Sequence, residues 1–327
     1  MNGTFNAIAF ALAAAGVPKL ASAQVFVHKG LCDASAAATL DARHFIVADD
    51  EKNILWMFDR KVAAPVGAVN LWEFLGINKK DESDIEGAAT IGNRTYWISS
   101  HGQNKRGGTE PSRHQFFASE FAVQAGGAPT VRLVGKPYTR LLEDLIADDK
   151  RFGQYDFARA SKLAPKQPGA LNIEGLADTA DGKLLIGFRN PLARGKALVI
   201  PLNNARQLLD GAGNGLVRAS FGDAIELDLQ GRGIRSIERV SAGYYIVAGP
   251  VGDDGAFGIY RWSGMAGAAP VLLHLPILDG LHPESLVVPA AGKIQILSDD
   301  GRKLVGGTAC KDLPKEARSF RSVTINQ

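Results

Sequence analysis

The chain has 327 residues, of which 46% are hydrophobic and 22% are charged, a composition typical of a globular protein that buries a large core. This composition excludes a disordered chain. The formal net charge is only +3, and the Lys and Arg residues are scattered along the sequence. Nucleic-acid binding needs a concentrated basic surface, so we expect no nucleic-acid partner.

The first 23 residues differ in character from the rest of the chain. Residues 7–17 form an apolar run that is too short to span a bilayer, and small residues at 21–23 precede Gln24. This pattern predicts a signal peptide at 1–23 and a mature domain at 24–327, in the periplasm or secreted, with no membrane segment after cleavage. An uncleaved N-terminal anchor is the alternative, because residues 1–6 contain no Lys or Arg.

The sequence contains two cysteines, Cys32 and Cys310, near opposite ends of the mature domain. In an oxidising compartment two such cysteines are able to pair. We therefore predict a disulfide bond between them. Two unrelated buried thiols are the alternative.

One short pattern recurs along the chain: a glutamate, an apolar run, a turn rich in Gly, Ala, Ser or Asp, and a second apolar run that ends in polar residues. Pairs of β-rich runs with such turns are typical of hairpins. The recurring glutamates are Glu86, Glu174, Glu238 and Glu284. The paired runs are 36–40 with 45–48, 88–91 with 95–98, 176–179 with 184–188, 239–240 with 244–248, and 285–288 with 294–297.

Two further strand-like runs follow most of these hairpins, for example 54–58 and 66–71. Four strands per unit are typical of a propeller blade. We predict an all-β fold, a single β-propeller with five four-stranded blades, or six blades if an insertion contains a degenerate unit. A β-sandwich or a solenoid is the alternative.

Two insertions account for the uneven spacing of the repeats. Residues 139–148 place apolar side chains at helical spacing and predict an inserted amphipathic helix. Residues 204–215 predict a loop or a short helix. A propeller must also close its ring, and we expect 25–28 and 322–325 to share the last blade, with the predicted disulfide at the same seam.

In a propeller, the start of each innermost strand and the end of the next strand lie on the same face. This geometry predicts that the recurring glutamates gather on one rim of the centre. Other polar residues at equivalent strand ends are expected beside them: Asp49, Asp50, Ser100, His101, Arg189, Asn190, Asp299 and Asp300.

Carboxylates that converge on one rim repel one another unless a cation, an arginine or a shared proton compensates. Oxygen ligands suit Ca²⁺ or another divalent cation. We expect Glu86, Glu174 and Glu284 to hold such an ion, with Asp49 and Asp299 completing or supporting the site. The alternative is structural, with each glutamate accepting hydrogen bonds from backbone N–H groups of the next blade.

His101 and Arg189 break the repeat, and a residue that only one blade carries is a better candidate for chemistry. With the metal site they predict hydrolysis of a small anionic ester, lactone or phosphoester, in which His101 transfers protons and Arg189 orients the anion. The alternative assigns His101 to a loop and lets Arg189 neutralise neighbouring glutamates. The whole protein is then a non-enzymatic module that binds a ligand or a protein.

Three groups of residues resemble a bacterial propeller family, the domain of unknown function 3616: Cys32-Asp33-Ala34-Ser35, Val47-Ala48-Asp49-Asp50-Glu51 and the two Ile-Glu-Gly motifs. The resemblance spans Gly30 to about Leu304. More distantly, the repeated Glu-Gly pattern is similar to esterase-like phytase propellers and gluconolactonase-type propellers. In those distant families a motif glutamate binds a divalent metal, and the similarity implies a propeller of a kind that is often exported. This sequence departs from the pattern at Ser35 in the first unit and at Glu238-Arg239 in the fourth.

Overall fold

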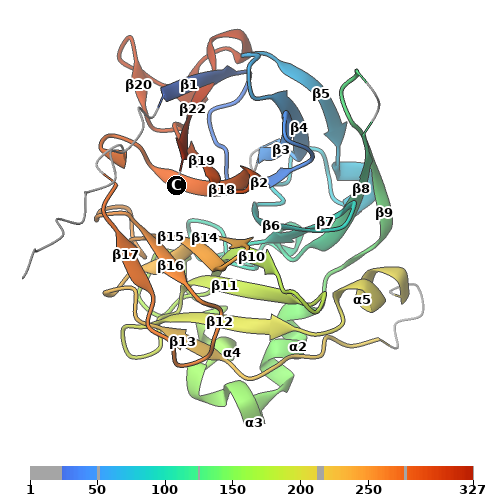
Figure 1. Cartoon of the computed structure of the whole chain (residues 1–327). Coiled ribbons are helices and arrows are strands. Elements are labelled where there is room, and N and C mark those ends of the chain that lie inside the picture. The colour runs from blue at the N-terminus through green and yellow to red at the C-terminus, as the bar shows by residue number, and fades with distance from the viewer. Residues whose placement is uncertain (1–23, 50–51, 124–125, 212–216, 276–277, 327) are drawn as a thin grey trace, which may run out of the picture.

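The computed structural model describes residues 24–49, 52–123, 126–211, 217–275 and 278–326. In this part of the chain, five four-stranded antiparallel sheets stand around a common centre as the blades of a β-propeller (Figure 1). The predicted all-β class and the five four-stranded blades are confirmed. The predicted signal peptide, residues 1–23, lies outside the described residues.

Each blade runs from an innermost strand at the centre of the ring to an outermost strand at its edge. In the first four blades the strands follow chain order. Blade 1 contains β2 (Ala36–Thr39), β3 (His44–Asp49), β4 (Ile54–Asp59) and β5 (Pro65–Asn70). Blade 2 contains β6 (Ile85–Ile91), β7 (Arg94–Ser99), β8 (Phe116–Ala122) and β9 (Thr130–Tyr138). Blade 3 contains β10 (Asn172–Asp178), β11 (Leu184–Asn190), β12 (Ala197–Leu202) and β13 (Ile225–Leu227). Blade 4 contains β14 (Gly233–Val240), β15 (Gly243–Gly249), β16 (Gly258–Trp262) and β17 (Val271–Leu273).

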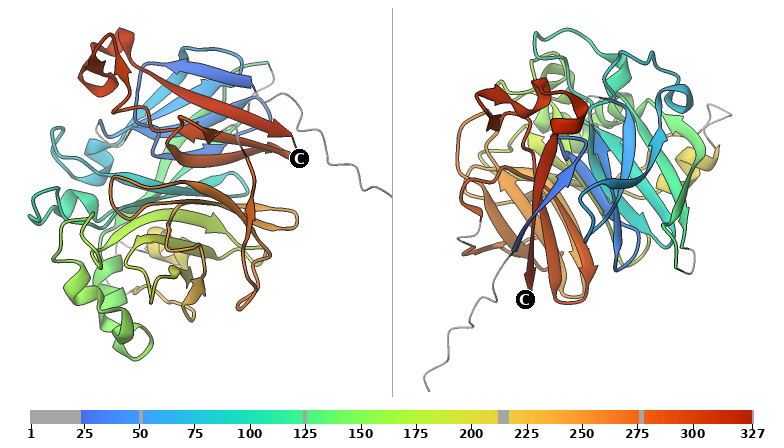
Figure 2. Two further views of the ribbon diagram at one scale, coloured as in Figure 1. Left: turned by 90° about the vertical axis from the view of Figure 1, so that its left-hand side faces the viewer. Right: turned by 90° about the horizontal axis from the view of Figure 1, so that it is seen from above.

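Blade 5 joins the two ends of the domain. Its order from the centre outwards is β18 (Pro283–Ala290), β19 (Lys293–Ser298), β22 (Ser319–Asn326) and β1 (Gln24–Lys29). The N-terminal strand β1 pairs antiparallel with the C-terminal strand β22, with Val25 opposite Val323 (Figure 2). The predicted shared blade is therefore confirmed, and both ends of the domain are held by one sheet.

The hydrophobic core is divided among the interfaces between neighbouring blades. Five clusters of buried apolar side chains each join one blade to its neighbour. One of them joins blade 5 to blade 1 and so completes the ring. Every blade is thus covered on both faces. This explains why the predicted runs are continuously apolar rather than alternating. In β3 and β11, for example, every residue is buried.

The two predicted insertions are both present. Between β9 and β10 the chain forms α2 (Leu141–Ala147), α3 (Asp149–Phe152), η2 (Gly153–Tyr155) and α4 (Phe157–Ala160). Helix α2 confirms the amphipathic helix predicted near 139–148, because it buries three leucines. The second insertion is α5 (Ala205–Gly211). Among the described helices, none is long and apolar enough to cross a membrane.

Three long connections lie on the face of the ring where the innermost strands begin. Figure 2, left, shows the helical insertion, the connection from β7 to β8 and the segment before β22 on the same side. The smaller elements of the chain are α1 (Trp72–Leu75), η1 (Pro111–Arg113), β20 (Leu304–Val305), β21 (Thr308–Ala309), η5 (Cys310–Asp312) and η6 (Lys315–Ala317). Below, this side is called the entry face.

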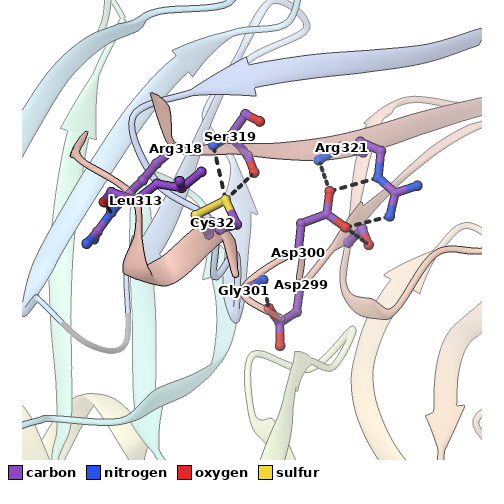
Figure 3. Close-up of a disulfide and its surroundings, with 10 residues drawn as sticks. Cys32, Asp299, Asp300, Gly301, Leu313, Arg318, Ser319 and Arg321 are labelled. Carbon is purple, nitrogen blue, oxygen red and sulfur yellow. Dashed lines mark hydrogen bonds and ion pairs between the residues drawn. A yellow bond between two sulfur atoms is a disulfide. The ribbon is translucent and has the colours of Figure 1, made fainter. Parts of the chain in front are cut away.

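The predicted disulfide is present between Cys32 and Cys310, with an S–S distance of 2.05 Å (Figure 3). Both cysteines are buried. The bond fastens the segment after β1 to the segment before β22, and the Asp300 amide adds a hydrogen bond to the Cys32 carbonyl at 3.0 Å. The disulfide and the shared blade therefore close the same seam of the ring.

Removing this disulfide is expected to lower stability strongly. The two cysteines are 278 residues apart, so the bond restrains almost the whole unfolded chain. We predict that the double variant Cys32→Ser/Cys310→Ser loses about 4–5 kcal/mol of unfolding free energy, as measured by urea denaturation. Reduced wild-type protein serves as the control and should lose a similar amount. A loss below about 1 kcal/mol in both would contradict this role.

Candidate functional site

The innermost strands of blades 2 to 5 share a β-bulge near their first residues. In each of them the pairing with the second strand skips one residue, and these four residues are therefore equivalent. They are Glu86, Glu174, Arg235 and Glu284. A bulge redirects a side chain and is common next to functional sites. Three of the four recurring glutamates occupy this position.

The fourth blade departs from the sequence prediction. The prediction that Glu238 occupies the repeat position was wrong, because the pairing of β14 with β15 places the bulge at Arg235. The dipeptide Ile237-Glu238 resembles the motif, but Ile234-Arg235 is the true equivalent of Ile173-Glu174. Glu238 lies three residues further along the strand, and its charged neighbours are Asp178 and Arg239.

Arg235 binds two of the equivalent glutamates. Its Nε donates to Glu284 Oε2 at 2.7 Å and its Nη2 donates to Glu284 Oε1, which makes a bidentate pair. The same Nε lies 2.9 Å from Glu174 Oε2, an ion-pair contact. All three side chains are more than nine-tenths buried. A guanidinium therefore occupies the place where two of these carboxylates converge.

Arg189 completes the cluster from the end of β11. Its Nη1 donates to Glu174 Oε1 at 2.9 Å. Its Nε donates to the Pro250 carbonyl at 3.1 Å, and its Nη2 to the Gly252 carbonyl at 2.6 Å. Each guanidinium nitrogen of Arg189 thus has a partner within the protein. This is the arrangement in which Arg189 neutralises a neighbouring glutamate, and it also holds the loop after β15 against the centre.

Three buried polar atoms of this cluster have no hydrogen-bond partner among the described residues. They are Arg235 Nη1, Glu174 Oε2 and Asn172 Oδ1, although Glu174 Oε2 keeps its ion-pair contact with Arg235 Nε. Asn172 belongs to the cluster because its Nδ2 donates to Glu174 Oε1 at 2.8 Å. Buried polar groups are nearly always satisfied in native proteins, so such atoms call for an external partner. We call Asn172, Glu174, Arg189, Arg235 and Glu284 the hub cluster.

The guanidinium of Arg235 carries its charge in spite of its burial. Burial lowers the pKa of Arg235 to about 10, while the negative charge of Glu174 opposes that shift. A pKa near 10 leaves the side chain protonated at neutral pH. Within the hub cluster, two arginines therefore balance two glutamates.

The remaining predicted metal ligands are Glu86, Asp299 and Asp49. Glu86 and Asp299 are partly buried and lie near enough for their charges to act on the pKa of Arg235. Asp299 Oδ1 also accepts a hydrogen bond from the Gly301 amide at 2.7 Å (Figure 3). Asp49 is buried at the end of β3. Within the described ranges, no three His, Cys, Asp or Glu side chains are grouped closely enough to hold a metal ion.

His101 does not extend into solvent as a mobile loop residue would. It is buried, its backbone has φ 54°, and its amide donates to the Arg113 carbonyl at 3.0 Å. Burial is the main cause that lowers its pKa to about 3, so the ring is neutral at pH 7. Its Nδ1 lies 2.8 Å from the Ser99 carbonyl. Because a carbonyl only accepts, Nδ1 must carry the proton.

The other ring nitrogen of His101 is consequently an acceptor. His101 Nε2 is buried without a hydrogen-bond partner in the described residues, and the ring stacks on His114 at a centroid distance of 5.5 Å. Beside it, Asp84 accepts hydrogen bonds from Arg113 Nη1 at 2.9 Å and from Ser100. Asp84 also has a positive φ, 51°. Two non-glycine residues with positive φ are thus both bonded to Arg113 at the entry face of blade 2, and such residues often accompany a functional site.

Sequence reasoning missed Arg235, Arg113 and Asn172. An isoleucine precedes the bulge in three blades, at positions 85, 173 and 234, but Ile237 precedes Glu238 in the same way, so this signal alone does not single out Arg235. Alignment on the glutamate shifted the fourth unit by three residues. Arg113 and Asn172 have no repeat signature, because each serves a contact that occurs in one blade only.

Family comparison agrees with the resemblance found in the sequence. Residues 122–276 match the model of the family described as protein of unknown function (DUF3616). The predicted resemblance to this family is confirmed over these residues, which are part of the predicted span from Gly30 to about Leu304. The DUF3616 match runs from the end of β8 past β17 and includes Asn172, Glu174, Arg189 and Arg235 of the hub cluster. Comparison with curated proteins found no match.

Several solved structures are similar to the chain at low identity. The PQQ-bound aldose sugar dehydrogenase from Streptomyces coelicolor is 13% identical with a TM-score of 0.42, over 93% of this chain and 98% of that one. A luciferin-regenerating enzyme is 11% identical with a TM-score of 0.39, over 93% and 96%. A GH43 glycoside hydrolase is 12% identical with a TM-score of 0.45, over 86% of this chain and 50% of that one. At such values these likenesses carry no information about activity.

Truncating Glu174 is expected to destabilise the fold. Both Arg189 and Arg235 are buried against this carboxylate, so its loss leaves buried positive charge without compensation. We predict that Glu174→Ala costs about 3–5 kcal/mol in urea denaturation. The control is Glu143→Ala, which removes a surface ion pair with Arg140 and should cost less than about 1 kcal/mol. Equal losses for the two variants would contradict the pairing.

His101 is expected to make stability depend on pH. Its folded pKa of about 3 lies below the ordinary value of 6.5, so only the unfolded chain takes up a proton as the pH falls below 6.5. Stability is then fully present above that pH and is lost towards acid. We predict that this histidine contributes about 2 kcal/mol to the loss of unfolding free energy between pH 7 and pH 5.

His101→Asn tests this contribution, because asparagine tolerates the positive φ of the site. The variant should lose about 2 kcal/mol less than the wild type over the same pH interval, in urea denaturation at both pH values. His28, whose pKa burial lowers to about 4, keeps its own contribution in both proteins. If the variant and the wild type lose the same amount, His101 is not buried in its neutral form.

Proposed function

We propose that this protein is a binding module for a small polar molecule, which it holds at the hub cluster on the entry face of the propeller. The observation that carries the proposal is a pair of buried atoms without a hydrogen bond, Arg235 Nη1 and Glu174 Oε2, of which Oε2 has only an ion-pair contact with Arg235 Nε. One is a donor and the other is an acceptor, and both belong to side chains that already contact one another.

Burial makes these atoms informative. An unmade hydrogen bond on a buried polar group costs about 1–3 kcal/mol, and more for a charged group. A protein under no functional pressure would avoid this cost by replacing the group or by pairing it. A bound molecule with an acceptor for Arg235 and a donor for Glu174 removes the cost and gains affinity from it.

The second candidate is a hydrolase that uses a divalent cation such as Ca²⁺ and acts on a small ester, lactone or phosphoester. In this candidate Glu86, Glu174 and Glu284 hold the ion and Asp49 and Asp299 support it. Two observations favour it: Glu86 and Asp299 add negative charge around the hub cluster, and His101 Nε2 is an unpartnered acceptor. We rank it second because Arg235 supplies positive charge between Glu174 and Glu284.

The disulfide bears on where the protein works. Structural disulfides persist in oxidising compartments, and the Cys32–Cys310 bond is buried and closes the ring. We therefore place the binding function in the periplasm or outside the cell. This placement agrees with the signal peptide predicted for residues 1–23.

The two candidates separate in one experiment. Thermal denaturation of the purified protein is followed with a panel of small carboxylates, phosphates, polyols and amines, with Ca²⁺ and Mg²⁺, and with EDTA. The binding module predicts that at least one organic class raises Tm and that EDTA changes nothing. The hydrolase instead predicts that EDTA lowers Tm, that Ca²⁺ or Mg²⁺ restores it, and that the metal-loaded protein cleaves test esters. If no organic class raises Tm, the binding proposal fails.

A further inference from the structure

We infer that the ligand of the hub cluster is a neutral molecule with neighbouring hydroxyl groups, that is, a polyol or a sugar. This inference rests on the proposed binding function and adds the chemical class of the ligand. It is drawn from three features of the cluster: the donor that is left free, the acceptors that are left free, and the balance of charge.

The free donor is one end of a guanidinium. Arg235 uses Nε and Nη2 for its bidentate pair with Glu284. Because the guanidinium is planar and rigid, this side-on pairing directs Nη1 away from the Glu284 carboxylate. Nη1 carries two N–H bonds and has no partner among the described residues. It therefore offers two hydrogen bonds to an oxygen of a ligand.

The free acceptors lie beside this donor. Glu174 Oε2 is a carboxylate oxygen that only accepts. It makes an ion-pair contact with Nε of the same guanidinium at 2.9 Å, which leaves one of its lone pairs for a ligand. The Asn172 amide donates from Nδ2 to Glu174 Oε1, which leaves its Oδ1 as a second acceptor. A partner must accept at one point and donate at one or two adjacent points. A hydroxyl group can both donate and accept a hydrogen bond. Neighbouring hydroxyl groups on one molecule can therefore accept from Arg235 and donate to Glu174 and Asn172.

The charges at the cluster argue against an ionic ligand. Arg189 and Arg235 balance Glu174 and Glu284, so neither an anion nor a cation finds uncompensated charge within it. Glu86 and Asp299 add negative charge nearby, which disfavours a carboxylate or a phosphate further. Free acceptors alone would suit an ammonium ion, but the two N–H bonds of Arg235 Nη1 would then stay unsatisfied. A neutral hydroxyl compound meets all three requirements.

An aromatic ring borders the same guanidinium. The Cζ atom of Arg235 lies 5.8 Å from the centre of the Phe257 ring, and Phe257 is only partly buried. The ring adds an apolar surface next to the polar atoms. Polyols and sugars carry C–H groups as well as hydroxyl groups, so this mixture of surfaces suits them.

The experiment compares ligand classes on the intact domain. Isothermal titration calorimetry measures binding of D-glucose, D-xylose, ribitol and myo-inositol, and separately of acetate, inorganic phosphate and ethanolamine. We expect at least one of the four hydroxyl compounds to bind and the three charged compounds not to bind. Arg235→Lys keeps the positive charge between the two glutamates but removes Nη1. It should weaken binding about tenfold or more.

Two further variants fix the location. Asn172→Ala removes one acceptor and should weaken binding of the same compound several-fold. Arg239→Lys is the matched control, because Arg239 lies on the same strand but pairs with Asp178 at 2.7 Å near its other end. It should leave the affinity unchanged. All variants are first checked for a wild-type circular dichroism spectrum and cooperative unfolding.

The outcomes separate the class of ligand from the binding function itself. If only a charged compound binds and Arg235→Lys weakens it, the binding function stands and the neutral class is wrong. If a hydroxyl compound binds equally well to Arg235→Lys, to Asn172→Ala and to wild type, its site lies elsewhere and the inference is overturned. If no compound of either class binds, both the inference and the proposed binding function are overturned.

Discussion

A buried guanidinium between two buried carboxylates is the interaction on which the centre of this propeller depends. The inner strands begin close together, and their bulges turn equivalent side chains towards one place away from water. Carboxylates there would repel one another at a cost that burial increases. Arg235 in the fourth blade and Arg189 at the end of β11 compensate within the chain. The fourth blade therefore carries an arginine at the repeat position, and this arginine compensates the charges of the glutamates in two other blades.

The position of Arg235 is determined by packing against strands that are distant in sequence. The local sequence alone does not determine it. A Cβ atom on Gly233 would lie 2.0 Å from the Arg189 carbonyl oxygen, so only glycine lets β14 approach β11 so closely. Pairing with β15 then sets the bulge two residues later. Ile237-Glu238 imitates the motif along the chain, and the choice between the two registers depends on contacts with β11 and β15 that sequence periodicity does not contain.

Much of the fold could be predicted from the sequence because it depends on local patterns of residues. Apolar runs with a turn between them predicted the first two strands of each blade, and the ring closure and the Cys32–Cys310 bond followed from the position of the chain ends. The candidate functional site was harder to predict from the sequence. His101 was predicted to transfer protons, and nothing in the sequence indicated that its amide bonds to Arg113 or that burial makes its ring neutral. Arg189 was expected to face a ligand, yet it bonds to carbonyls of Pro250 and Gly252 that lie far away in sequence.

The central claim is that Arg235 compensates Glu174 and Glu284 and leaves Nη1 for a neutral oxygen. The most direct measurement is a crystal structure at high resolution, with anomalous data, of protein purified and crystallised in the presence of Ca²⁺. The account predicts a guanidinium between the two carboxylates and a water or ligand oxygen within hydrogen-bond distance of Nη1. A cation bound between Glu174 and Glu284, with Arg235 turned away from both, would contradict it.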